Sequence, residues 1–442
     1  MVATHTVVAG ENLPAVAASL LGDAGLALLV ATASGIAPST ELQAGQRLLL
    51  PGHRRHTVAE GETPATLASH YYGDPGFARF IVSANGITED LPPGRHLVIP
   101  ELRRYEVAAG ETLGELATRF YDDAALAQLI AAANDNDSPA AGDALAIFTG
   151  RADGFGLTIV DSNEDDARLW YYRFQTSAIG WNPGIDVLLP DGYHTSGLTY
   201  PVLYLLHGGG QDFRTFDSLG IRELTEGQPI VLVMPDGGRA GWYSNPTGSF
   251  VGPRNWETFH MGQLVPWIEA NFRVWAEQDG RGIAGFSMGG FGALKYTARY
   301  PDRFASVSSH SGPASLRRDF GLVVHWANIT SATVELGGAT VYGAPFWNQA
   351  KVTADNPVEQ LERYRGKRIF LVAGTSPDPV YWFDAVNEIQ VLAGQREFRQ
   401  RLTTAGIPHE AHEEPGGHVF RPEIFVDDLA GIVSHLRAAA PE

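Results

Sequence analysis

The segment Gly285-Phe286-Ser287-Met288-Gly289 has the Gly-x-Ser-x-Gly pattern that often surrounds a reactive serine. Residues 281–284 before it predict a short strand, and residues 291–298 after it predict a helix. A serine at the apex of a sharp strand-to-helix turn is exposed for attack, and the flanking glycines avoid collisions between strand and helix. The sequence therefore predicts a nucleophile elbow at Ser287, with an ordinary glycine-rich turn as the alternative.

A serine hydroxyl needs a base within hydrogen-bond distance and a third group that holds the base. Because the expected order along the chain is serine, acid, histidine, both partners are sought after Ser287. His418 is the preferred base, since it follows the last predicted strand, residues 409–413, on a glycine-rich turn. The competing histidines lie within or beside predicted strands, where histidine is usually structural: His310, His409 and His412.

Two carboxylates can serve as the acid. Asp378 follows the predicted strand at residues 369–372, which is a common place for this carboxylate. Glu388 lies ten residues further on, at the start of a predicted helix. Spacing alone does not choose between them.

An oxyanion hole needs two backbone N–H groups that point to the developing negative charge. Met288, directly after the nucleophile, is the first expected donor. The second is expected from the His-Gly-Gly-Gly loop at residues 207–210, an arrangement found in esterases. Gly209 is the preferred donor in this loop, and Gly210 is the next choice.

The first third of the chain is repetitive. Residues 5–12 recur as residues 56–63 and 105–112, at a spacing of about 50 residues that marks an array of small modules. Each copy continues with two helix-like segments and closes on a short apolar strand. This strand–helix–helix–strand pattern resembles the LysM module, most clearly in Gly61-Glu62-Thr63, Asn85-Gly86 and Leu97-Val98-Ile99-Pro100.

LysM modules bind chains of N-acetylglucosamine, as in peptidoglycan or chitin, so the resemblance implies glycan binding by at least one copy. The implied groove residues are Gly61, Glu62, Thr63, Asn85, Gly86, Ile87, Gly110, Glu111, Thr112 and Asn134. Copy one departs from the pattern with Asn12 and Ser34, and copy three lacks the closing Ile-Pro. The alternative is that some copies are spacers or protein contacts.

Composition limits the remaining functions. The chain has 442 residues and a formal charge of −18, which argues against nucleic acid or an anionic membrane surface as partner. It has no cysteine, which excludes disulfides and thiolate metal sites. The N-terminus shows no signal-peptide pattern and no apolar run reaches transmembrane length. We expect neither a metal nor an organic cofactor.

Residues 150–168 are polar and acidic and predict a linker that includes one strand at residues 157–160. From residue 169 onward, short apolar segments alternate with helix-like segments. This alternation predicts a mostly parallel sheet with helices on both faces. The strands are expected at residues 181–189, 202–206, 230–233, 283–284, 305–308, 369–372 and 409–413.

Residues 169–437 resemble the esterase-D superfamily of α/β-hydrolases, and within it the antigen-85-type mycolyltransferases and related actinobacterial esterases. The resemblance rests on residues 234–238, 242–244, 256–259, Leu264, 267–268 and 270–271. In that family the acid is a glutamate at the head of a helix that carries an aromatic residue about ten positions on, matched here by Phe398. The resemblance therefore favours Glu388, with Asp378 in reserve.

Two departures from that family concern the acyl and acceptor sites. The segment after His418 is Val419-Phe420-Arg421-Pro422, and the oxyanion loop is the His-Gly-Gly-Gly noted above. Ester hydrolysis is thus expected more firmly than mycolyl transfer to trehalose.

We therefore predict three βααβ LysM-like modules at residues 4–51, 55–100 and 104–149, a linker at 150–168 and an α/β-hydrolase domain at 169–442. The predicted protein is a serine esterase or acyltransferase that acts on acylated glycans or lipids of a bacterial cell envelope. Two alternatives remain at this point. One is a structural or adhesive part of a phage tail or injection device, and the other is a cytoplasmic hydrolase of small esters.

Overall fold

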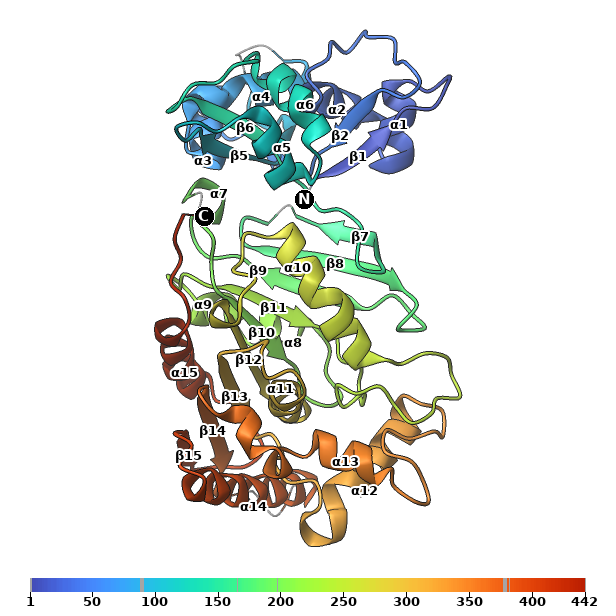
Figure 1. Ribbon diagram of the computed structural model, residues 1–442, viewed down its shortest axis with the longest axis vertical. Helices are drawn as coiled ribbons and strands as arrows, with labels where there is room; N and C mark the ends of the chain where they lie inside the picture. The colour runs from blue at the N-terminus through green and yellow to red at the C-terminus, as the bar shows by residue number, and fades with distance from the viewer. Residues whose placement is uncertain are drawn as a thin grey trace. The chain divides into compact units, whose positions relative to one another are not determined.

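The computed structural model describes residues 2–87, 91–164, 166–196, 198–376, 380 and 382–441. The chain divides into two compact units. The first contains Met1–Asp153 with two short segments, Gly192–Leu198 and Ala270–Phe272, and the second contains the remainder. Figure 1 gives the labels of the elements used below.

Each repeat in the first unit folds as strand, helix, short 3₁₀ turn, helix and strand, and its two strands pair antiparallel. The first repeat contains β1 (Ala3–Thr6), α1 (Leu13–Leu20), α2 (Ala27–Ala33) and β2 (Arg47–Leu50). The second contains β3 (His53–Thr57), α3 (Pro64–Tyr72), α4 (Ala78–Asn85) and β4 (His96–Pro100). The third contains β5 (Leu102–Glu106), α5 (Leu113–Tyr121), α6 (Ala127–Asn134) and β6 (Ala144–Phe148).

The three repeats are joined in cyclic order by main-chain hydrogen bonds. The N–H of Gly52 donates to the carbonyl of Thr149 at 2.9 Å, and the N–H of Thr149 donates to the carbonyl of Glu101 at 3.0 Å. The N–H of Glu101 donates to the carbonyl of Gly52 at 2.8 Å, which completes the cycle. These residues occupy equivalent positions after the closing strand of each repeat. The repeats therefore form a closed ring with approximate threefold symmetry.

Side chains repeat the same cyclic order around the ring. In each repeat an aspartate caps the 3₁₀ turn, and an arginine of the next repeat in the cycle pairs with it: Arg55–Asp23, Arg104–Asp74 and Arg47–Asp123. Partly exposed ion pairs of this kind contribute little stability, about 0–1 kcal/mol each. The buried contacts between the repeats contribute more. A methyl group on Gly35, for example, would lie 2.4 Å from the carbonyl carbon of Ala132.

Within the described residues, the second unit is built on a nine-stranded sheet in the order β15-β14-β13-β12-β10-β11-β9-β8-β7. Strands β10 to β15 run parallel, whereas β9, β8 and β7 are antiparallel to their neighbours. The bounds are β7 (Leu157–Asn163), β8 (Leu169–Thr176), β9 (Gly184–Leu188), β10 (Val202–Leu206), β11 (Val231–Pro235), β12 (Arg281–Phe286), β13 (Ser306–His310), β14 (Arg368–Gly374) and β15 (Glu410–Glu414).

Two features of this sheet differ from the sequence prediction. The segment expected to be a linker with one strand at residues 157–160 contains β7, which extends to Asn163 and pairs with β8 as the edge of the sheet, and the second unit begins at Gly154. Strand β8 itself was not expected. The physical reason is exposure: most side chains of β7 face solvent, so its sequence is polar and lacks the apolar run of a buried strand.

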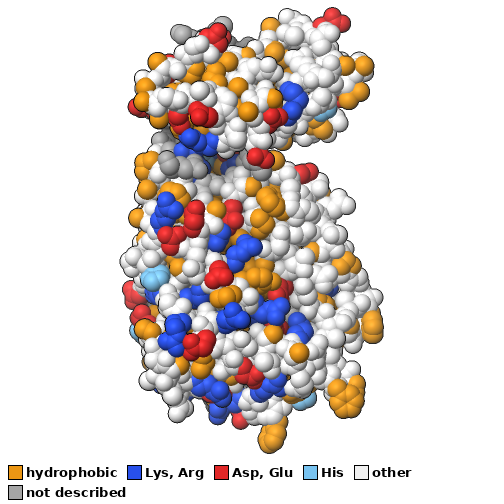
Figure 2. All heavy atoms as spheres, viewed as in Figure 1, with side chains coloured by type: hydrophobic (Ala, Val, Ile, Leu, Met, Phe, Trp, Pro, Cys, Tyr) orange, Lys and Arg blue, Asp and Glu red, His pale blue; other side chains and the backbone are white. Residues whose placement is uncertain are grey.

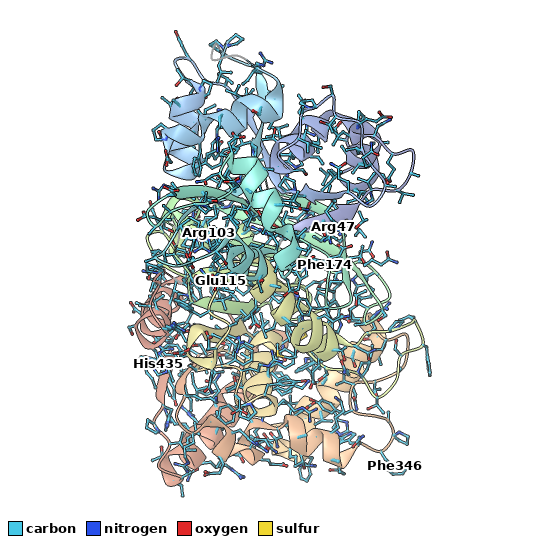
Figure 3. The ribbon with its side chains drawn as sticks, turned by 45° about the horizontal axis from the view of Figure 1, so that its top comes forward. Arg47, Arg103, Glu115, Phe174, Phe346 and His435 are labelled. Carbon is cyan, nitrogen blue, oxygen red and sulfur yellow. The ribbon has the colours of Figure 1, made fainter. Side chains whose placement is uncertain are left out.

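Helices cover both faces of the sheet, as expected (Figure 1). Apolar side chains of α8 (Thr215–Ser218), α9 (Ile221–Leu224) and α15 (Pro422–His435) pack with β10 and β11 in one core cluster. On the other face, Trp267 of α10 (Val265–Asn271) packs edge-on against Phe174 of β8. Phe174 is labelled in Figure 3. The remaining α- and π-helices described in the second unit are a π-helix (Thr258–Leu264), α11 (Met288–Arg299), α12 (Arg318–Val334), α13 (Gln349–Asp355) and α14 (Trp382–Thr404). Helix α7 (Tyr193–Ser196) belongs to the first unit.

Acidic and basic side chains alternate over the face seen in Figure 2, so the net negative charge is not gathered into one field on that face. Among the described helices, none combines the length and apolar character that a membrane crossing requires.

Candidate active site

Ser287 lies between the end of β12 and the start of α11, in a strained backbone conformation with φ 56° and ψ −117°. The two glycines of the pattern are required by close packing. A methyl group on Gly285 would lie 2.3 Å from the backbone of Gly289, and one on Gly289 would lie 2.0 Å from the carbonyl oxygen of Leu206. The local geometry is therefore the sharp strand-to-helix turn that the sequence predicts.

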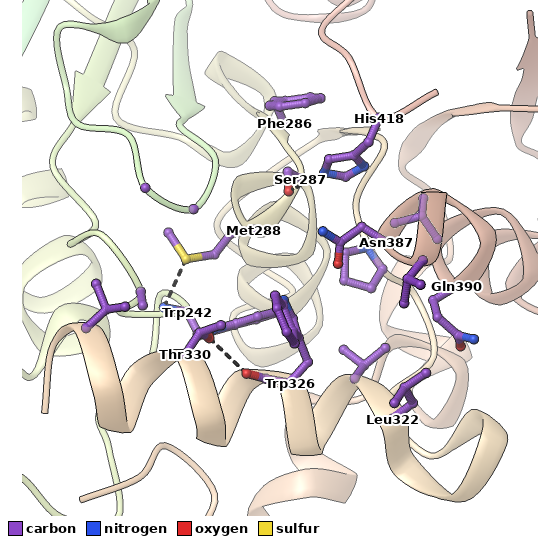
Figure 4. Close-up of a pocket in the computed structure, with 18 of the residues that line it drawn as sticks. Trp242, Phe286, Ser287, Met288, Leu322, Trp326, Thr330, Asn387, Gln390 and His418 are labelled. Carbon is purple, nitrogen blue, oxygen red and sulfur yellow. Dashed lines mark hydrogen bonds between the residues drawn. The ribbon is translucent and has the colours of Figure 1, made fainter. Parts of the chain in front are cut away.

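The structure brings Ser287, His418 and Glu388 into one hydrogen-bonded chain. The Nε2 atom of His418 lies 2.7 Å from Oγ of Ser287, and its Nδ1 atom lies 2.6 Å from Oε2 of Glu388. Figure 4 shows the imidazole directed at the serine. Because the carboxylate accepts a hydrogen bond from Nδ1–H, Nε2 is left unprotonated and accepts from the serine hydroxyl.

Glu388 is fully buried and is held from two further directions. Its Oε1 atom accepts from Oγ of Ser311 at 3.0 Å and from the backbone N–H of Gly374. The sequence suggested that Glu388 lies at the start of a helix. In the structure it lies inside α14, which begins at Trp382. Asp378, the reserve acid, lies outside the described residues.

The turn that carries His418 is fixed by backbone and side-chain contacts. The N–H of Ser376 donates to the carbonyl of Gly416 at 3.0 Å, and the guanidinium of Arg421 donates to the carbonyl of Gly417 at 2.9 Å. The ring of Phe286 packs beside the imidazole at 5.2 Å between centroids. These contacts orient the imidazole before any substrate binds.

The other histidines are engaged elsewhere. His310 is buried at the end of β13 and pairs with Asp428 of α15 at 2.9 Å. His412 pairs with Glu410 at 2.7 Å, and His409 contacts the carbonyl of Ile407. None of these contacts leads to Ser287.

The two expected oxyanion donors lie at the same pocket as Ser287. Met288 is the first residue of α11, so its N–H lies at the unsatisfied end of the helix. The N–H of Gly210 already donates to the carbonyl of Arg239 at 2.7 Å, and that of Gly208 donates to Gln211. For Gly209, no hydrogen bond from its N–H is found in the part of the chain that is described. The geometry therefore favours Gly209 over Gly210.

A pocket of about 470 Å³ opens beside Ser287 and is lined mainly by apolar side chains (Figure 4). Helices α12 and α14 both contribute to its wall. The indole N–H of Trp242 donates to Oγ1 of Thr330 on α12 at 3.0 Å, and its backbone N–H contacts the sulfur of Met288 at 3.4 Å. The residues from α12 are Leu322, Val323, Trp326, Thr330 and Val334. No motif in the sequence marks this wall, because its residues are spread over one helix.

The Trp-Glu-Thr-Phe segment behind the site has a structural role. Glu257 pairs with Lys295 of α11 at 2.7 Å, and this fully buried lysine also donates to the carbonyl of Tyr243 and to Oγ of Ser244. Burial raises the pKa of Glu257, but the cations of Lys295 and Arg299 outweigh it and lower the pKa to about 2. The pair ties the nucleophile helix to the loop around Trp242.

In the first unit, the expected groove residues all have contacts within their own module. Glu62 accepts from the N–H of Ala59 at 2.7 Å and contacts His56, and Glu111 accepts from Ala108 and Tyr105 in the same way. Thr63 and Thr112 cap their helices, and Gly61 and Gly110 have φ of 85° and 84°. These residues shape the turn between first strand and first helix.

The second half of the expected groove is also built from structural contacts. Asn85 donates to the carbonyls of Ile81 and Val98 and accepts from the N–H of Val98, and Asn134 makes the equivalent three bonds. In copy one, Ser34 replaces the asparagine and accepts from the N–H of Leu49. Gly86 caps α4 with φ of 55°, and Ile87 is buried. The repeat pattern is thus explained by folding, whether or not a glycan binds.

Among the described residues, no group of three or more histidine, aspartate or glutamate side chains is arranged to hold a metal ion. The serine, imidazole, carboxylate and backbone N–H groups described above are sufficient for acyl transfer without one.

Comparisons with known proteins agree with this chemistry. The family model Esterase matches residues 176–436. The chain is 66% identical over 447 residues to Esterase Rv1288 of Mycobacterium tuberculosis (strain ATCC 25618 / H37Rv), covering 100% of this chain and 98% of the relative. It is 34% identical over 149 residues to the diacylglycerol acyltransferase/mycolyltransferase Ag85A of Mycobacterium ulcerans, covering 32% and 42%.

Among solved structures, an S-formylglutathione hydrolase from Agrobacterium tumefaciens matches with a TM-score of 0.50 and 17% identity, over 63% of this chain and 99% of that chain. At this level of identity the match shows the fold alone.

Proposed function

The chain belongs to the Esterase family of α/β-hydrolases and is a serine enzyme that hydrolyses carboxylic esters, and from this premise we propose that Ser287 is its nucleophile. The observation that supports this most directly is the chain of hydrogen bonds from Glu388 through His418 to Ser287 at the mouth of an apolar pocket. The proposed mechanism uses these three side chains and two backbone N–H groups.

In the first step Oγ of Ser287 attacks the ester carbonyl while Nε2 of His418 takes its proton. Glu388 holds the imidazole and stabilises the imidazolium that forms. The N–H groups of Gly209 and Met288 stabilise the tetrahedral oxyanion. His418 then protonates the leaving alcohol, which leaves an acyl group on Ser287. Water or a sugar hydroxyl, activated by the same imidazole, releases the acyl group.

The pocket supports a preference for esters of aliphatic acyl chains over acetyl esters. Its volume of about 470 Å³ is within the range of ligand sites, and an acetyl group would leave most of its apolar wall in contact with water. The pocket opens beside Ser287 and is lined by residues of both α12 and α14. We propose that the acyl chain lies along α12.

We further propose that the substrate belongs to a bacterial cell envelope, as an acylated glycan or a lipid ester, and that the LysM-like modules hold the enzyme near it. The partial similarity to Ag85A, a diacylglycerol acyltransferase/mycolyltransferase by name, and the resemblance of residues 4–149 to glycan-binding modules support this proposal. An envelope or extracellular location follows from the same reasoning.

The nucleophile is tested by replacing Ser287 with alanine. We expect turnover of p-nitrophenyl esters to fall by about 10⁶, and fluorophosphonate labelling to disappear. Unchanged hydrolysis would refute the mechanism.

The acyl preference is tested with a series of p-nitrophenyl esters of increasing chain length. Val334→Trp should fill the pocket and lower kcat/KM for octanoate while sparing acetate. Ile329→Trp is the matched control, because Ile329 lies on the same helix and is as exposed as Val334 (57% and 55%) but does not line the pocket. Equal effects of both variants on octanoate would contradict the proposed binding mode.

The envelope substrate is tested by incubating the enzyme with whole cell envelope, quenching in acid and weighing the acyl group on Ser287 by mass spectrometry. A long-chain acyl adduct is expected. An acetyl adduct alone would contradict the proposed substrate.

A further inference from the structure

A buried carboxylate outside the triad connects helix α12 to the loop at residues 236–243, which in turn contacts the oxyanion loop at residues 207–210. Glu335 directly follows α12 and is buried, with 7% of its surface exposed. Its Oε2 accepts from the backbone N–H of Ala240 at 2.9 Å, and its Oε1 accepts from the indole N–H of Trp256. The carboxylate fills the space beside Gly238, where a methyl group would lie 2.2 Å from its nearer oxygen.

The loop that Glu335 holds, residues 236–243, is in contact with the oxyanion segment. The carbonyl of Arg239, the residue before Ala240, accepts the N–H of Gly210 at 2.7 Å. That bond fixes the peptide next to Gly209. The N–H of Gly237 donates to His207 at 2.8 Å, at the other end of the His-Gly-Gly-Gly segment. A displacement of this loop would therefore turn the Gly209 N–H away from the substrate oxygen.

We propose that Glu335 is a positioning residue for the oxyanion hole, which couples the pocket wall formed by α12 to the placement of the Gly209 N–H. The inference rests on the proposed role of Gly209 as oxyanion donor. The hydrogen bond from the indole N–H of Trp242 to Thr330 is a second connection between the same loop and α12, and it supports the same coupling. An acyl chain that orders α12 would thus also order the oxyanion hole, so that longer acyl chains increase the rate of the chemical step as well as binding.

The charge state of Glu335 supports this arrangement. Burial raises the pKa of its carboxyl group, and Asp236 raises it further, against the hydrogen bonds from Ala240 and Trp256 and the charge of Arg254. Once protonated, the carboxyl group loses one of its two acceptor positions for the loop and the indole. The loop contact is therefore strongest at neutral and higher pH.

The test replaces Glu335 with glutamine, which has nearly the same shape but only one acceptor oxygen. We expect kcat for p-nitrophenyl octanoate to fall about 10- to 100-fold with little change in KM, less than the 10²–10³ that follows from loss of a whole oxyanion donor. The affinity for a trifluoromethyl ketone, which forms a tetrahedral oxyanion on Ser287, should fall by the same factor.

Two controls separate this role from simple destabilisation. Glu269→Gln removes another carboxylate with a raised pKa, one that is partly buried and paired with Arg281 away from the oxyanion loop. It should lower the melting temperature without changing kcat. Trp256→Phe removes one of the two donors to Glu335 but leaves the bond from Ala240, and should keep kcat within a few-fold of the parent.

The outcomes are distinguishable. If fluorophosphonate fails to label Ser287 in the parent enzyme, the proposed nucleophile is wrong. If the parent is labelled and Glu335→Gln is labelled at the same rate, with unchanged kcat and ketone affinity, the positioning role is refuted. Should Glu335→Gln not fold, Glu335→Asp, which withdraws the charge by one methylene, must show the same loss of kcat for the inference to stand.

Discussion

Replacing Glu388 with glutamine tests the proposed triad most sharply, because the surrounding donors dictate how the new amide must lie. In the parent, Oε1 accepts from Ser311 and from the backbone N–H of Gly374, and Oε2 accepts from His418. The Gly374 N–H cannot rotate away. The amide oxygen of glutamine must therefore take the Oε1 position, since the reverse orientation would bury two facing donors, at a cost of about 1–3 kcal/mol for each unpaired group.

In that orientation the amide NH₂ group faces Nδ1 of His418. The imidazole must then accept at Nδ1 and carry its proton on Nε2, so it can no longer accept the proton of Ser287. In serine proteases the corresponding change lowers kcat by about 10⁴, which is about 5 kcal/mol of activation free energy. We expect a loss of the same size here, with an unchanged melting temperature to within a few degrees.

The assay is turnover of p-nitrophenyl octanoate together with fluorophosphonate labelling, both at pH 8. Two variants serve as controls. Ser311→Ala removes one donor to Glu388 but leaves Gly374 in place, so the loss should stay below about tenfold. Asp378→Asn should have no effect. If Glu388→Gln keeps turnover within tenfold of the parent while Asp378→Asn loses about 10³ or more, Asp378 is the acid and the reasoning fails.

Three further outcomes follow from the contacts described above. Gly35→Ala should destabilise the first unit by roughly 1–3 kcal/mol more than Gly10→Ala. Both glycines have positive φ, but only Gly35 faces the backbone of Ala132. Hydrogen exchange of α2 and α6 measures the difference. Burial lowers the pKa of His260 to about 4. Below about pH 6.5 the unfolded chain therefore binds a proton at this residue that the folded chain does not bind, so the free energy of unfolding should fall by about 3 kcal/mol between pH 6.5 and 4. Urea titrations of His260→Gln should lack that decrease. Lys295→Met should leave the buried carboxylate of Glu257 with only the partly exposed Arg299 as a cationic partner and cost about 3 kcal/mol in urea unfolding, the low end for breaking a buried pair, and Glu257→Gln added to it should restore part of that loss.

The sequence predicted the parts of the site that depend on local patterns. The buried strands β10, β12 and β14 were recognised because they are short apolar runs between helices. The elbow was recognised from its glycines, which are required because a methyl group on either would lie 2.0–2.3 Å from neighbouring backbone atoms. The order of serine, acid and histidine along the chain led to His418, and the structure places its Nε2 atom 2.7 Å from Oγ of Ser287. Edge strand β7 was read as a linker that includes one strand because its side chains are exposed and polar.

Other parts have no signal in the sequence. Spacing could not choose between Asp378 and Glu388, because the choice depends on where α14 lies against β14. The wall of the pocket and the position of Glu335 depend on α12, which joins the site only through packing. The ring of repeats is the clearest case. Its central hydrogen bonds are made by the main chain, so the three equivalent positions carry different residues, Gly52, Glu101 and Thr149.

The ring changes what glycan binding by the first unit would mean. The turns between first strand and first helix, at Gly10, Gly61 and Gly110, have open space beside them and are related by the approximate threefold axis. A linear glycan has no such symmetry, so one strand cannot contact all three turns in the same way. If the modules bind N-acetylglucosamine chains, they bind separate strands, and avidity on a crosslinked mesh should exceed the affinity for a soluble oligomer by about 10² or more.

Sedimentation of the full chain with insoluble peptidoglycan, compared with calorimetry against soluble chito-oligosaccharides, measures this difference. Gly35→Ala, which strains one joint of the ring, should reduce the binding to the mesh while leaving the affinity for the oligomer nearly unchanged. Equal affinities for mesh and oligomer in the parent would mean that a single module carries the binding, and the threefold arrangement would then serve folding alone.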